Sequence, residues 1–332
     1  MTGEYFPTLA SARELASARN WTDLSRFGSS VAPEEIEQAP ELAYLIADAR
    51  RRTGDLDGAR QLGDSAYAGA LRAADTRLTL RALNLAGMID FESGAIAQAE
   101  EKFGELLERA TELRDDEFAA RAANNLGIIA NVREERELAL TSYQRAMATY
   151  ERLGHLRGLA QTSYNLGISY RDMGFADAAD KLYSRAMLHG TACASEDVVA
   201  LAETERALLR AHSGDADLAE RLARRALERL ERLGDPLGAA NAVRALGAAA
   251  MARGDKGGAL ELLDRALSTA REHGDPLLTA EIQLDRGAIL LEMNSLSIGS
   301  AAIEEAVAAF EQLGSRGAAN SARALLPRCE RK

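Results

Sequence analysis

The four histidines and two cysteines are the residues best suited to bind a metal ion or attack a substrate, and they are scattered along the chain. The histidines are His155, His189, His212 and His273, and the cysteines are Cys193 and Cys329. The sequence has no HExxH pattern and no CxxC pair, although metal and redox sites typically need ligands at such short spacing. We therefore expect no metal site, and the separated cysteines favour a reducing compartment.

Phosphate-binding loops and catalytic carboxylates are not indicated either. The segment LGDPLGAA at 233–240 has neither a GxGxxG pattern nor a GK[ST] ending. In the arginine-rich segment 221–234, Arg224, Glu228 and Arg232 are four residues apart, which predicts ion pairs along one solvated helix. The sequence therefore predicts a protein that is not an enzyme, needs no cofactor and acts by binding.

Charge and composition narrow the class of binding protein. The 332 residues include 47% hydrophobic but only 5% aromatic residues, and alanine is abundant. Alanine is the best helix former, whereas β-sandwiches and barrels need β-branched and aromatic residues. The net charge of −11 disfavours nucleic acid as a partner. No apolar run is long enough to span a bilayer, and the N-terminus does not resemble a signal peptide, so we expect a cytoplasmic protein with no membrane partner.

A period of 40 residues organises most of the chain. Helix-breaking residues recur at this spacing: Gly54, Gly94, Glu134, Gly174, Gly214, Gly254 and Asn294. Small residues stand seven positions before each of them, and again five positions after, as with Gly167 and Ala179 around Gly174. We infer seven repeats in which small residues let two helices approach closely.

Each repeat is predicted to be a pair of helices, a first helix A and a second helix B, joined at its helix-breaking residue. A glycine just after a helix closes the last turn in the left-handed conformation without a steric penalty. Asp55, Asp215 and Asp255 directly follow such glycines and are predicted to cap the next helix. Glu134 suits that conformation poorly, so we expect an irregular turn in the third repeat.

These residues resemble the tetratricopeptide repeat (TPR) family. The fourth repeat matches its signature best, through Leu166, Gly167, Tyr170, Ala179, Tyr183 and Ala186. The fifth and seventh repeats depart from it, with Arg206 and Arg286 at the Leu position. The resemblance implies an all-α, right-handed superhelical solenoid of helix-turn-helix repeats. The 40-residue length is similar to that of extended repeats in bacterial regulatory TPR arrays and in some eukaryotic adaptor proteins.

We predict three regions along the chain. Residues 1–39 are expected to form N-terminal capping helices, with two short helices around Asn20 and Trp21 sealing the first repeat. Residues 40–314 hold the seven repeats, which start near 40, 80, 120, 160, 200, 240 and 280. Residues 315–332 are expected to form a final capping helix and a tail, because the terminal faces of a repeat array need a polar cover.

The resemblance also implies where a ligand binds. In TPR arrays the concave wall comes from helix A, chiefly from positions 2, 5, 6, 9 and 12 of each repeat. In repeats 2 to 4 this face is rich in amide, apolar and aromatic side chains, and asparagine can both donate to and accept from a peptide backbone. The predicted peptide-binding groove consists of Arg81, Asn84, Met88, Arg121, Asn124, Asn125, Ile128, Gln161, Tyr164, Asn165 and Ile168. Within it, Arg81 and Arg121 are expected to attract an acidic group of the ligand. An alternative left open is that the asparagines only cross-link neighbouring helices.

Two kinds of function fit this sequence. The first is an adaptor or regulator that holds a peptide or a helix of a protein partner in the groove. The second is a sensor that binds a small signalling peptide or a metabolite. A self-assembling scaffold, and with it a homo-oligomer, also stays open, and the sequence names no particular partner.

Overall fold

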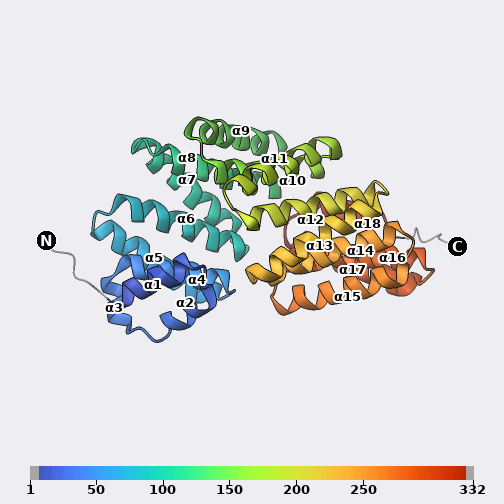
Figure 1. The fold of residues 1–332 in the computed structure, drawn as a ribbon, viewed down its shortest axis with the longest axis horizontal. Coiled ribbons are helices and arrows are strands. Elements are labelled where there is room, and N and C mark those ends of the chain that lie inside the picture. Colours follow the sequence, from blue (N-terminus) through green and yellow to red (C-terminus); the bar gives the residue numbers. More distant parts are fainter. Residues whose placement is uncertain (1–6, 327–332) are drawn as a thin grey trace. The chain divides into compact units, whose positions relative to one another are not determined.

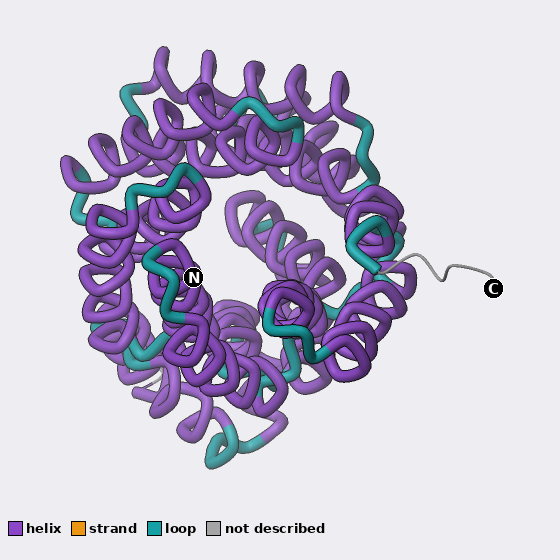
Figure 2. Tube along the Cα trace, turned by 90° about the vertical axis from the view of Figure 1, so that its right-hand side faces the viewer, coloured by secondary structure: helices purple, strands orange, loops and turns teal. Residues whose placement is uncertain are grey.

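A computed structural model describes residues 7–326 of the chain. Residues 1–6 and 327–332, which include Cys329 and the expected C-terminal tail, lie outside the described part. The described residues form eighteen α-helices and no strand, joined by short loops (Figures 1 and 2). The predicted all-α solenoid of helix-turn-helix repeats is confirmed. Within the described part, no helix is both long enough and apolar enough to cross a bilayer.

The helices come in consecutive pairs along the chain. From the second repeat on, the A helices begin 40 residues apart. The N-terminal helices are α1 (Pro7–Ser17), α2 (Trp21–Gly28) and α3 (Pro33–Gln38). The A and B helices of the seven repeats are, in order, α4 (Pro40–Arg52) and α5 (Leu56–Arg72), α6 (Thr76–Glu92) and α7 (Ile96–Glu112), α8 (Asp116–Val132) and α9 (Arg136–Leu153), α10 (Leu156–Asp172) and α11 (Ala176–Ala192), α12 (Glu196–His212) and α13 (Ala216–Leu233), α14 (Pro236–Ala252) and α15 (Lys256–Glu272), α16 (Pro276–Glu292) and α17 (Leu296–Gln312). The last described helix is α18 (Arg316–Arg323).

The chain divides into two compact units, Met1–Ile129 and Ala130–Lys332, which we call the N-terminal and C-terminal units. In the N-terminal unit, Asn20 caps α2. Trp21 packs on the core cluster around Leu24, and the guanidinium of Arg52 lies 4.4 Å from the Trp21 ring. The short helix α3 was not predicted; it begins with Pro33, whose fixed φ suits a first helical position.

The predicted close approach of helices A and B rests on small residues. Ala99, Ala139, Ala179, Ala219 and Ala259, one from each of five B helices, are completely buried. A Cβ on Gly87 would lie 2.6 Å from the Phe103 ring of α7, and one on Gly167 would lie 2.6 Å from the Tyr183 ring of α11. The aromatic side chain of helix B thus fills the space that the missing Cβ leaves on helix A.

The predicted aspartate caps are confirmed, but the turn at Glu134 differs from the prediction. Asp55, Asp215 and Asp255 each accept a hydrogen bond from the backbone N–H three residues later. The irregular turn expected at Glu134 is wrong: Glu134 adopts φ +63°, in the left-handed region used by the glycines at equivalent positions. Glu134 therefore adopts the left-handed conformation of this turn, although glutamate disfavours it.

Several non-glycine residues occupy this conformation at helix ends, and Ala74 after α5 is the simplest case, with φ +53°. A left-handed backbone costs an L-residue roughly 1–2 kcal/mol, which glycine avoids. We expect Ala74→Gly to raise the free energy of unfolding by about 1 kcal/mol in urea titrations, after allowing for the greater freedom of glycine in the unfolded chain. The reverse change, Gly94→Ala at φ +78°, should lower it by a similar amount. A lower stability for Ala74→Gly would contradict this account of the turns.

Candidate functional site

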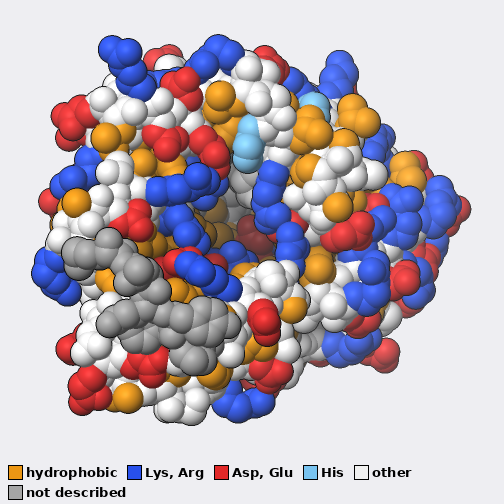
Figure 3. All heavy atoms as spheres, turned by 60° about the vertical axis from the view of Figure 1, so that its left-hand side comes forward, with side chains coloured by type: hydrophobic (Ala, Val, Ile, Leu, Met, Phe, Trp, Pro, Cys, Tyr) orange, Lys and Arg blue, Asp and Glu red, His pale blue; other side chains and the backbone are white. Residues whose placement is uncertain are grey.

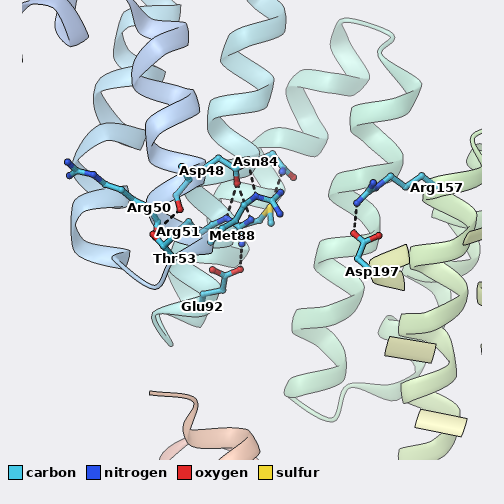
Figure 4. A network of polar contacts seen from close by, with 11 residues as sticks. Asp48, Arg50, Arg51, Thr53, Asn84, Met88, Glu92, Arg157 and Asp197 are labelled. Atoms are coloured by element: carbon cyan, nitrogen blue, oxygen red, sulfur yellow. Dashed lines mark hydrogen bonds and ion pairs between the residues drawn. The ribbon is translucent and has the colours of Figure 1, made fainter. Parts of the chain in front are cut away.

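In the N-terminal unit, the predicted groove asparagines bond to one another. The Nδ2 of Asn125 on α8 donates to the Oδ1 of Asn84 on α6 at 3.0 Å, and Asn124 donates to Asn125 at 3.3 Å. Asn84 also donates to the sulfur of Met88, one turn further along α6, at 3.3 Å (Figure 4). Asn84 is 8% exposed and Asn124 is 5% exposed. In this unit the asparagines cross-link two neighbouring A helices, which is the alternative that the sequence left open.

The arginines of the same unit have partners as well. Arg81 stacks over the Tyr44 ring at 4.3 Å. Arg121 lies 5.0 Å from the Phe118 ring and forms an ion pair with Glu117 at 2.9 Å. Arg51 of α4 forms ion pairs with Asp48 of the same helix and with Glu92 of the neighbouring α6 (Figure 4). Ile128, the remaining predicted residue on α8, is half-buried.

If the Asn84–Asn125 bond cross-links the two helices, its loss should lower the free energy of unfolding. Asn125→Ala would leave the buried Oδ1 of Asn84 without its donor, which costs about 1–3 kcal/mol. We expect a fall of that size in the free energy of unfolding of Asn125→Ala. Because both residues share one bond, the double change with Asn84→Ala should cost less than the sum of the single changes. Additive effects in this double-mutant cycle would mean that the bond contributes nothing.

In the C-terminal unit, the predicted residues lie on α10. Asn165 is 6% exposed, whereas Gln161, Tyr164 and Ile168 are half-buried. Tyr164 and Ile168 pack against the core cluster that contains Tyr183, and the ring centroids of Tyr164 and Tyr183 are 6.0 Å apart. These residues border a larger polar surface that the sequence did not predict.

That surface is a row of charged side chains on the A helices α10, α12, α14 and α16, in which each helix contacts the next. Arg171 of α10 forms ion pairs with its neighbour Asp172 at 2.8 Å and with Glu205 of α12. Two helices further on, Arg244 of α14 reaches Asp285 of α16 at 2.6 Å and also pairs with Glu281. We call these six residues the charged strip. With four carboxylates and two guanidinium groups, the charged strip carries a net negative charge.

A tyrosine hydroxyl lies beside the charged strip without a partner. Tyr183 is completely buried, and its hydroxyl makes no hydrogen bond within the described part of the chain. Burial raises the pKa of Tyr183 well above its usual range, and the nearby Glu205 carboxylate raises it further. The hydroxyl therefore stays protonated.

The charges of the strip are coupled to one another. Burial alone would lower the pKa of Arg171, but the carboxylates of Glu205 and Asp172 outweigh burial and hold this pKa well above its usual value. Burial raises the pKa of Glu281, and Arg244 opposes that shift. A further cation placed near Glu281 would therefore favour its charged form.

The charged strip was missed because the groove was assigned to repeats 2 to 4 alone. The signal was present: position 6 of repeats 5 and 7 gives Glu205 and Asp285, position 5 of repeat 6 gives Arg244, and position 2 of repeat 7 gives Glu281. The prediction favoured repeats 2 to 4 because their helix A faces are rich in amide side chains.

The ion pairs expected within 221–234 are also wrong in detail. Arg224 pairs with Glu220 instead of Glu228. Arg225 and Arg229 of α13 extend to Glu203 on α12, a carboxylate that is only 1% exposed. A buried carboxylate on the partner helix attracts an arginine more strongly than an exposed one on the same helix, because it has less water to screen it.

Charged side chains of both signs cover the visible face in Figure 3, and hydrophobic side chains lie between them singly or in small groups. Residues 7–326 contain no group of three or more His, Cys, Asp or Glu side chains that could hold a metal ion.

Comparison with known proteins shows similarity of fold at low sequence identity. No family model matches the sequence, and no curated protein matches it. Among solved structures, a Rap protein complexed with Competence and Sporulation Factor is 15% identical, with a TM-score of 0.61 over 96% of this chain and 95% of that one. The Rap conjugation gene regulator of plasmid pLS20 in complex with the Phr* peptide is 16% identical, with a TM-score of 0.58 over 97% and 96%. The apo form of the quorum sensor NprR from B. thuringiensis is 11% identical, with a TM-score of 0.53 over 96% of each chain. The chain therefore has the TPR-type fold of these regulators.

Proposed function

We propose that this protein is a non-enzymatic regulator that binds a short peptide through the charged strip of its C-terminal unit. The observation that carries the proposal is the row of ion pairs with surplus carboxylates on the A helices α10, α12, α14 and α16. Such a surface offers hydrogen-bond donors and acceptors together with charge, and these are what extended peptides need for recognition.

The comparisons support the ligand class. Two of the structures with this fold are a complex with Competence and Sporulation Factor and a complex with the Phr* peptide. The charge of the strip refines the expectation: because carboxylates outnumber guanidinium groups, the ligand should carry a basic side chain or a free N-terminal ammonium group. This differs from the acidic ligand group that Arg81 and Arg121 suggested in the sequence, since both arginines already stack on aromatic rings.

Of the asparagines in the predicted groove, only Asn165 is proposed to contact the ligand. Asn165 and Tyr164 border the charged strip on α10 and would contact the peptide backbone and an apolar side chain, respectively. Asn84 and Asn125 bond to each other and would serve stability instead.

A random peptide library tests the proposal even though the natural partner is unidentified. The full chain is immobilised, bound peptides are recovered and sequenced, and the same selection is run on a variant with Glu281→Gln and Asp285→Asn. We expect peptides enriched in lysine or arginine from the wild type and loss of that enrichment from the variant. Enrichment of acidic peptides, or equal enrichment by both proteins, would contradict the proposal.

A further inference from the structure

A polar cavity that shares no residue with the charged strip lies between α15, α16 and α17 of the C-terminal unit. Its volume is about 490 Å³, within the range of pockets that hold small molecules. The lining residues are Asp264, Leu267, Ser268 and Arg271 of α15, Gln283 and Arg286 of α16, and Glu305 of α17. It is therefore built from both B helices of repeats 6 and 7 and from the A helix between them.

Gln283 is an unexpected residue in this place. It is 4% exposed, and the equivalent position in repeats 2, 3 and 6 holds the buried apolar residues Leu83, Ala123 and Val243. Its Nε2 donates to a carboxylate oxygen of Glu305, while its Oε1 has no hydrogen-bond partner within the described part of the chain. Rotating the amide would not help, because it would place Oε1 against the Glu305 carboxylate. Such an unpaired buried carbonyl is destabilising, and packing alone does not justify it.

The fifth repeat has ion pairs at the position equivalent to Gln283. There the equivalent of Gln283 is Glu203, which forms ion pairs with Arg225 and Arg229. Eighty residues after these two arginines the seventh repeat has Glu305 and Ala309. The seventh repeat thus has no arginine at either position, and Gln283 bonds to Glu305 instead.

The remaining lining residues define the chemistry of an occupant. Arg271 uses Nη2 to pair with Glu305, and Arg286 uses Nε to pair with Asp264, each at 2.6 Å. A guanidinium has five N–H donors, so each arginine can bind a further acceptor. Gln283 contributes an acceptor that needs a donor, and Leu267 adds an apolar wall.

We propose that this cavity binds a small molecule with a carboxylate and an N–H donor, of the size of an amino acid or a dipeptide. The carboxylate binds Arg286 and Arg271, and the N–H group donates to Oε1 of Gln283. The site is separate from the charged strip, so the protein would respond to a metabolite as well as to a peptide.

Thermal melts of the full chain test this inference, with the common L-amino acids and a set of dipeptides as probes at millimolar concentration. At least one compound should raise the melting temperature, and its methyl ester, which lacks the carboxylate, should not. Arg286→Leu restores the residue that the repeat signature has at this position, so it should fold normally yet weaken binding by about tenfold or more. Arg265→Ala, an exposed arginine on α15 outside the cavity, is the matched control and should bind as the wild type does.

Gln283→Leu separates a binding role from a structural one. If Gln283 serves a ligand, this variant should melt at the same temperature as the free wild type or higher, because it removes the unpaired carbonyl, and it should lose the response to the probe. A lower melting temperature of the free variant would assign Gln283 to stability alone. The inference is overturned by that result, by a panel in which no compound raises the melting temperature, or by an Arg286→Leu variant that responds as the wild type does.

Discussion

Gly87→Leu should destabilise the protein by about 3 kcal/mol, near the upper end of the usual cost of overpacking. A Cβ at this position would lie 2.6 Å from the Phe103 ring, and Phe103 is 2% exposed, so the ring has no room to move away. The two helices of the second repeat would have to separate, and their buried alanines would lose contact. Thermal and urea denaturation monitored by circular dichroism measure the effect.

Gly104→Leu is the matched control in the same repeat. A Cβ on Gly104, in the middle of α7, would meet no atom within 4 Å. Leucine is the better helix former by up to about 1 kcal/mol, so this variant should be at least as stable as the wild type. If both variants lose the same stability, crowding between helices A and B is not what limits the Gly87 position.

The second large effect concerns binding. Replacing Glu281 and Asp285 by their amides keeps the size of both side chains and removes both carboxylates that face Arg244. A basic peptide selected by the wild type should lose about 100-fold in affinity or more, since losing the charged partner of a bonded, desolvated group costs about 2–5 kcal/mol. Calorimetric titration of the wild type and the double variant with the same peptide gives the difference directly.

Glu220→Gln provides the control for that experiment. Glu220 on the B helix α13 also forms ion pairs with arginines, Arg224 and Arg253, but it lies outside the charged strip. Its loss should leave the affinity unchanged. An equal loss of affinity in both variants would indicate a general effect of net charge, and an unchanged affinity in the double variant would move the ligand away from α16.

The architecture was predictable because it depends on a few local rules repeated many times. Small residues at Ala179 and its equivalents, and turns closed by residues such as Gly174, specify helix pairs wherever they recur. A single weak position does not alter such a pattern, because the neighbouring helices fix the turn. Glu134 therefore adopts the glycine conformation in spite of its side chain.

Side-chain partners were less predictable because they depend on which helices become neighbours. Asn125 has the right residue type and position for a ligand contact, yet Asn84, 41 residues earlier, engages it. Arg229 reaches a carboxylate on α12 instead of one on its own helix. Glu281 and Asp285 are ordinary charged residues in the sequence, and they gain significance only when Arg244 is placed between them.

Hydrogen–deuterium exchange of the full chain, with and without a peptide selected from the library, tests most directly whether the charged strip is the binding site. The account predicts slower amide exchange on binding in the A helices α10, α12, α14 and α16, with little change in the B helices α11, α13, α15 and α17. Protection confined to the B helices or to the inter-helix turns would contradict it.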